Sequence, residues 1–176
     1  VTYTFTLRRG LEWSDGSIVE AQDFVAGLTH ALLPGTNAPF ARDLAGIQGA
    51  EELMTGAATK LAGATAPDGH TVKIVLKARS QSFLSMLALP VAMPMPHRRG
   101  TTAERDNLLS NGPFVAEPTE SGLALARNPR FYGAKSNDIA RVNFTIAASA
   151  DDAIAMVRKG EAQLSWAFPM MLPEAR

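Results

Sequence analysis

Alternating apolar and polar positions predict extended strands in several parts of the chain. Near the start, Tyr3, Phe5 and Leu7 alternate with threonine or other polar residues, which is the pattern of a strand with one buried face. Comparable strand signals recur in five further segments, residues 71–76, 114–117, 123–127, 141–147 and 163–167. The turn between the second and third of these segments predicts a β-hairpin.

Apolar residues at three- and four-residue intervals predict helices between the strands. From residue 20 onward, Phe24, Leu28 and Leu32 recur at helical spacing, and Pro34 with Gly35 ends the pattern. Further helical segments are expected in residues 41–54, with interruptions at the glycines, and in residues 82–88.

Two segments rich in turn residues are expected to lack regular structure. Residues 63–70 contain an Asp-Gly pair and predict a loop. Residues 89–96 contain three prolines, which forbid a helix and favour extended chain.

The last helix has the clearest local signals. Ser149 can cap it, Asp152 completes a capping box, and Lys159 with Gly160 follows its end. Because strands are expected on both sides of this helix, residues 142–167 predict a βαβ unit with two parallel strands.

Composition narrows the possible functions. The 176 residues are 46% hydrophobic, so a sizeable core can be buried, and 17 basic and 17 acidic residues balance to zero net charge. This balance gives no support for nucleic-acid binding. The chain has no cysteine, and no apolar run is long enough to cross a bilayer. Because a strand pattern starts at Val1 without an initiator methionine, we expect a piece of a longer protein.

The sequence contains no recognisable set of catalytic residues. His30, His70 and His97 are far apart and lack the paired spacing of metal ligands, so we expect no metal site. There is no phosphate-binding loop and no nucleophile elbow, so no cofactor is expected.

Several motifs resemble, in order, the family 5 extracytoplasmic solute-binding proteins, which serve ABC importers of oligopeptides, dipeptides and nickel. The first is an aromatic strand followed by Trp13-Ser14-Asp15-Gly16 and a helix start containing Asp23-Phe24. The others are FLSMLALPVAMPMP, NGPFVAEP, LARNPRFYG and VRKGEAQLSWAF, which begin at residues 83, 111, 125 and 157. Glu20 departs from the family's threonine cap and is a poorer cap, so a less well fixed helix start is expected.

This resemblance implies a mixed α/β fold of the type II periplasmic-binding-protein class, present only in part. Residues 1–96 would form the small accessory domain, and residues 97–176 an incomplete segment of the main binding lobe that includes the βαβ unit. The implied function is capture of peptides or similar solutes in the periplasm or at the extracellular membrane surface. Permease subunits of an ABC importer would be the partners, and the truncated chain would self-associate through uncovered apolar surface.

The resemblance also implies a ligand site. Phe40, in the loop of residues 37–40, matches a position where relatives place a ring near bound peptide. Trp166, Ala167 and Phe168 match the strand that pairs with the ligand backbone. Relatives often carry asparagines at the last two positions, so backbone contacts are expected there. Core packing is the alternative for Trp166 and for Phe40. Pro39 and the polar residues before it predict that Phe40 is exposed.

Trp13 is expected to pack at the corner between the first strand and helix, with its N–H hydrogen-bonded, and contact with ligand is the alternative. Arg8, Asp15 and Asp23 are expected to fix the same corner by hydrogen bonds and ion pairs. Two other functions remain open: part of an enzyme whose active-site residues lie outside this piece, and an interaction module.

Overall fold

The chain divides into two compact units, which are described separately. The computed structural model describes residues 1–97, 109–119, 122–133 and 139–165. Unit 1 comprises Val1–Val115 with Arg127–Asp138, and unit 2 comprises Ala116–Ala126 with Ile139–Arg176. Both units contain strands, and helices accompany them, so the predicted mixed α/β class is confirmed. No helix in the described part of the chain is long and apolar enough to cross a membrane.

The sheet of unit 1 has three antiparallel strands in the order β1-β3-β2. They are β1 (Thr2–Thr6), β2 (Ala64–Asp68) and β3 (Thr71–Val75). Phe5 lies opposite Val72, and Tyr3 opposite Ile74, so the apolar residues of both strands share one face. Val72 and Ile74 are buried on this face.

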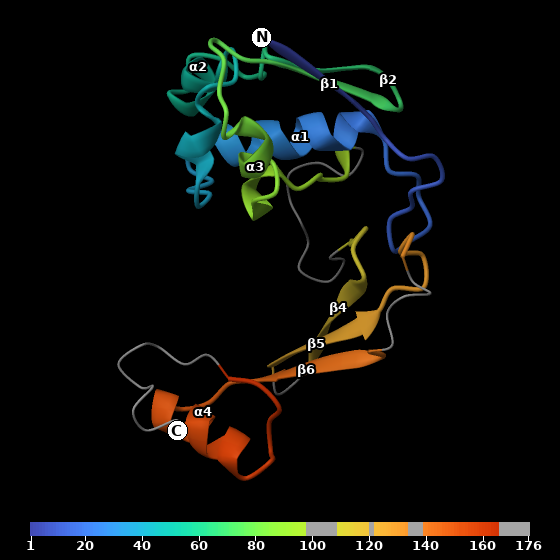
Figure 1. Cartoon of the computed structure of the whole chain (residues 1–176), viewed down its shortest axis with the longest axis vertical. Helices are drawn as coiled ribbons and strands as arrows, with labels where there is room; N and C mark the ends of the chain where they lie inside the picture. Colours follow the sequence, from blue (N-terminus) through green and yellow to red (C-terminus); the bar gives the residue numbers. More distant parts are fainter. Residues whose placement is uncertain (98–108, 120–121, 134–138, 166–176) are drawn as a thin grey trace. The chain divides into compact units, whose positions relative to one another are not determined.

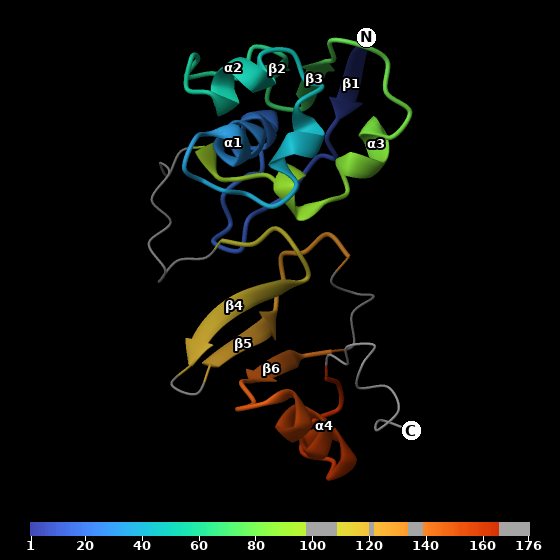
Figure 2. The same ribbon diagram turned by 90° about the vertical axis from the view of Figure 1, so that its left-hand side faces the viewer.

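Helix α1 (Ala21–Leu32) covers that face of the sheet (Figures 1 and 2). Its residues Val25, Leu28 and Leu32 are buried in the hydrophobic core of unit 1. Fully burying one such side chain contributes roughly 1.5–3 kcal/mol, so this helix face is a main source of stability. The shorter elements around it are η1 (Ala41–Leu44), α2 (Ala50–Met54), α3 (Phe83–Met86) and η2 (Pro90–Ala92).

Trp13 is buried at the corner between β1 and α1, as predicted. Its Nε1 donates a hydrogen bond to Asp23 Oδ2 at 3.0 Å, and the backbone N–H of Glu20 donates to the same oxygen at 2.9 Å. The expectation that Glu20 leaves the helix start poorly fixed is therefore wrong, because Asp23 completes a capping box from inside the helix.

The other oxygen of Asp23 holds a segment that is remote in sequence. The backbone N–H of His97 donates to Asp23 Oδ1 at 2.9 Å, and His97 Nδ1 lies 2.7 Å from the same atom. Because a carboxylate only accepts, Nδ1 carries the proton of this hydrogen bond. Met95 N also donates to the Asp23 carbonyl at 2.9 Å. A Cβ at Gly27 would collide with the Met93 carbonyl, which explains why the helix interior has glycine where this segment crosses.

Two of the other expected corner residues behave differently. Asp15 accepts hydrogen bonds from the backbone N–H and the hydroxyl of Ser17, at 2.9 and 2.6 Å, and so closes the turn after Trp13. Arg8 lies over the ring of Tyr132 with its guanidinium carbon 5.0 Å from the ring centroid, a cation–π contact.

Unit 2 is built on the predicted hairpin. Strands β4 (Phe114–Thr119), β5 (Gly122–Arg127) and β6 (Arg141–Thr145) form a sheet in that order, and α4 (Ala150–Arg158) follows. The predicted cap of α4 is confirmed, since Ser149 Oγ accepts from Asp152 N at 3.1 Å.

The structure corrects two expectations in unit 1. Residues 64–68, expected in a loop, form β2. Their side chains have low strand propensity, but their backbone groups form hydrogen bonds with β3. The register shifts between Thr65 and Asp68, which accommodates the missing N–H of Pro67. Residues 90–92 form a short 3-10 turn, which Pro90 tolerates because it stands in the first turn.

Part of the expected second strand of the predicted βαβ unit is also corrected. Residues 163–165 form no strand, and among the described strands β6 pairs with β5 in the antiparallel sense. Leu164 is 88% exposed, so no apolar layer supports a strand there. Trp166 and Ala167, the rest of the expected strand, lie outside the described residues.

We expect Asp23→Asn to lower the free energy of unfolding by about 2–4 kcal/mol, measured by urea denaturation. The substitution places an amide NH₂, itself a donor, against the donors that surround the carboxylate. Asp43→Asn, at an exposed position in the same unit, is the matched control and should change stability little. A similarly small loss for Asp23→Asn would contradict the central role of this carboxylate.

The same carboxylate predicts an acid dependence. Burial opposes ionisation of Asp23, but the hydrogen bonds from His97, Glu20 and Trp13 outweigh it and lower the pKa below the usual value. A lowered folded pKa stabilises the protein above the unfolded pKa of about 3.9, and this contribution is lost as the pH falls through the folded value. Denaturation curves at stepwise lower pH should therefore lose stability more steeply in the wild type than in Asp23→Asn.

Candidate ligand-contacting surfaces

The loop that joins α1 to η1 has an unusual backbone. Asn37 has φ +49° and Phe40 has φ +64°, both in the left-handed region that side chains other than glycine seldom adopt. Asparagine tolerates this region, but for Phe40 it costs about 1–2 kcal/mol. Such strain persists only where surrounding contacts impose it, and it often marks functional sites.

The contacts that impose this conformation lie at both ends of the loop. Thr36 Oγ1 donates to the carbonyl of His30 at 3.0 Å, which ties the loop to the end of α1. Ala38 packs against the core, and its carbonyl accepts from Ala41 N at 3.2 Å. Phe40 is nevertheless 59% exposed, so a loop tethered at both ends presents an aromatic side chain on the surface.

Of the residues predicted to contact ligand, only Phe40 lies in the described part of the chain. Trp166, Ala167 and Phe168 lie outside the described residues, so their proximity to Phe40 stays a prediction. The exposure of Phe40 agrees with the polar, proline-containing loop from which it was predicted.

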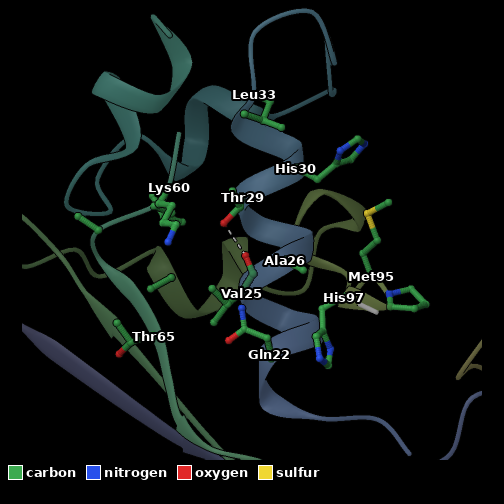
Figure 3. Close-up of a pocket in the computed structure, with 14 residues that line it drawn as sticks. Gln22, Val25, Ala26, Thr29, His30, Leu33, Lys60, Thr65, Met95 and His97 are labelled. Carbon is green, nitrogen blue, oxygen red and sulfur yellow. Dashed lines mark hydrogen bonds between the residues drawn. The ribbon is translucent and has the colours of Figure 1, made fainter. Parts of the chain in front are cut away.

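A groove along α1 was not predicted from the sequence. Its volume is about 550 Å³ (Figure 3). The described residues that line it come from α1 and the residue after it, from residues 60–65 and from residues 95–97: Gln22, Val25, Ala26, Thr29, His30, Leu33, Lys60, Leu61, Ala62, Ala64, Thr65, Met95, Pro96 and His97. The sequence signal that could have indicated it is the run of small or polar residues Gln22, Ala26 and Thr29 at helical spacing. This run lies beside the buried residues of the same helix.

The described residues contain no group of three His, Cys, Asp or Glu side chains that could hold a metal ion. Asp68 has a lowered pKa because the backbone N–H of His70 donates to it at 2.8 Å in the β2–β3 turn. Its role is thus to close a turn. The two surfaces just described are therefore the candidates for binding.

Comparison of the architecture with solved structures places it in the type II periplasmic-binding-protein class. The Escherichia coli murein tripeptide binding protein MppA superposes with a TM-score of 0.82 at 29% identity, over 98% of this chain and 36% of that one. The unliganded open form of the MppA protein gives a TM-score of 0.82 at 30% identity.

Sequence comparison gives the family. Residues 1–175 match the bacterial extracellular solute-binding proteins, family 5 middle, and the chain belongs to this family. Among its relatives, the probable deoxycholate-binding periplasmic protein YgiS of Escherichia coli is 32% identical over 97% of this chain and 34% of its own. The oligopeptide-binding protein OppA of Bacillus subtilis is 28% identical over 94% of this chain and 32% of its own. The chain thus spans about a third of the length of these relatives.

We expect Phe40→Gly to have a free energy of unfolding about 0.5–1 kcal/mol higher than Phe40→Ala, as measured by urea denaturation. Glycine adopts the left-handed conformation without the steric cost, and the gain exceeds the greater entropy that glycine loses on folding. Both variants remove the same exposed ring, so their difference isolates the backbone. Equal stabilities, or a less stable glycine variant, would show that position 40 is not strained.

Proposed function

We propose that this chain is part of the substrate-binding component of an ABC importer, and that the whole protein captures peptides or related small solutes. The observation that carries this proposal is the family match over residues 1–175, together with the fold shared with MppA. The names of the relatives include oligopeptide-, dipeptide-, murein-peptide- and deoxycholate-binding proteins, so the proposed ligand class extends from peptides to other small amphipathic solutes.

The proposed location is the periplasm or the extracellular face of the membrane, with permease subunits as the partners. The periplasmic names of several relatives support this location. A role in binding, rather than catalysis, agrees with a family defined by solute binding. The alternative, part of an enzyme, has no corresponding support among these relatives.

Within this function, we assign residues 1–96 to the accessory domain and residues 97–176 to the main binding lobe. The compact unit built around α1 extends beyond this boundary, to Val115, and includes residues 127–138. Ligand capture would bring two lobes together by a hinge motion, and most of the second lobe would lie beyond this chain. A ligand pocket normally buries most of the ligand's surface, which a single wall cannot do. The 176-residue chain alone should therefore bind peptide weakly or not at all.

The proposed contacts are Phe40, by its exposed ring, and Trp166, Ala167 and Phe168, chiefly by their backbone. The exposure of the Phe40 ring and the hydrogen bonds that tether its loop support this assignment, because a loop that is already held loses less entropy on binding.

The test begins with mass spectrometry of solutes that co-purify with a chain extended to the length of the relatives. Calorimetry with the identified solute should then show about 5–20-fold weaker binding for Phe40→Ala, the loss typical of an exposed aromatic contact of about 1–2 kcal/mol. Leu84→Ala, at an exposed apolar position of the same unit, is the matched control and should leave affinity unchanged.

Equal affinities of the wild type, Phe40→Ala and Trp166→Ala, with all three proteins folded, would contradict the site assignment. Binding by the 176-residue chain as tight as that of the extended chain would contradict the two-lobe mechanism.

We also propose that the 176-residue chain self-associates through unit 2. On one face of its sheet Leu123 lies opposite Phe144, and Leu125 opposite Val142. Phe144 is 50% exposed, and exposed apolar patches favour association. Sedimentation velocity should show a concentration-dependent oligomer that Phe144→Ser weakens and that Thr145→Ser, the neighbouring exposed position, does not. A monomer at all concentrations would refute this proposal.

A further inference from the structure

The groove along α1 has a preformed shape. Its floor is the outward side of the helix, where Gln22, Ala26 and Thr29 succeed one another (Figure 3). Lys60 and Thr65 lie on one side of the helix in this view, and Met95 and His97 on the other. The small side chains of Ala26 and Thr29 leave space on the floor, and longer side chains border the groove on both sides.

Both walls are held by hydrogen bonds independent of any ligand. Met95 N donates to the Asp23 carbonyl, and His97 is bound to the Asp23 carboxylate through its backbone and its ring. On the other side, Gly63 N donates to the Gln48 carbonyl at 2.7 Å, and the buried Leu61 anchors the wall in the core. A site whose walls are already fixed loses little conformational entropy when it binds a ligand.

The lining residues that the structure describes carry charge of one sign. Among them Lys60 is the permanent cation, and none is an aspartate or glutamate. No ion pair joins Lys60 to another residue in the described part of the chain. His30 also lines the groove, and its Nδ1 is buried without a hydrogen-bond partner among the described residues.

The rest of the lining is mainly apolar. Its apolar side chains are Val25, Ala26, Leu33, Leu61, Ala62, Ala64, Met95 and Pro96. A volume of about 550 Å³ falls within the range of small-molecule sites. The complementary ligand therefore has an apolar body and one negative charge.

We propose that this groove is a second binding site, and that it takes a small amphipathic carboxylate whose carboxylate pairs with Lys60 while its apolar body lies over Val25 and Ala26. This site is separate from the loop of Phe40, whose residues do not line it. It therefore does not depend on the proposed capture of peptide.

The test is calorimetry of decanoate, below its micelle concentration, with the 176-residue chain. Decanoate should bind, and Lys60→Met should weaken it about tenfold, the loss expected when a charge-assisted hydrogen bond to the carboxylate is removed. Lys60→Arg should restore most of the affinity. Lys73→Met, at an exposed lysine on β3 that does not line the groove, is the matched control and should bind as the wild type does.

Decyltrimethylammonium, with the same chain and the opposite charge, should bind at least tenfold more weakly than decanoate. Equal affinity for the two probes would show that the groove is a non-specific apolar surface, and it would overturn the proposal. Equal loss in Lys60→Met and Lys73→Met, or no decanoate binding at all, would also overturn it.

Phe40→Ala should leave decanoate affinity unchanged, so failure of the peptide proposal and failure of this one are distinguishable. Loss of decanoate binding in a longer chain that contains these residues would show that another part of the protein fills the groove. That result would also overturn the proposal.

Discussion

The buried carboxylate of Asp23 is the constraint on which unit 1 depends. A buried charge is tolerated only when donors surround it, and here the donors come from the Trp13 ring, the backbone at Glu20, and the backbone and ring of His97. These groups belong to the loop after β1, the start of α1 and a segment 74 residues further along the chain. One side chain thus fixes the position of three segments relative to one another.

Both candidate surfaces follow from the position of α1. The buried residues of this helix pack against the sheet, and its outward residues form the floor of the groove. The segment that Asp23 holds forms one wall of the groove. At its other end the helix holds the strained loop, because the His30 carbonyl accepts a hydrogen bond from Thr36. The two surfaces differ in kind: the loop presents a single ring, whereas the groove encloses a volume with a cation in its lining.

The two units differ in how they are stabilised. The hydrophobic core cluster of the described residues lies within unit 1, whereas α4 of unit 2 has no buried residue. The helix of unit 2 is fixed locally, by its cap, and its sheet is held by antiparallel pairing and by the ion pair of Arg141 with Glu117 at 2.6 Å. One apolar face of its sheet is therefore left partly exposed, at Leu123 and Phe144.

Local signals determined α1, the hairpin and the cap of α4, because hydrophobic spacing, turn residues and capping side chains act within a few residues. Phe40 could be predicted as exposed for the same reason, from the polar residues and proline before it. Tertiary structure alone decided the rest. Residues 64–68 form a strand because they pair with β3. Residues 163–165 do not form a strand, because no apolar layer covers Leu164. The groove exists because Asp23 holds His97 beside α1. None of these outcomes depends on neighbours in sequence, so no local pattern encodes them.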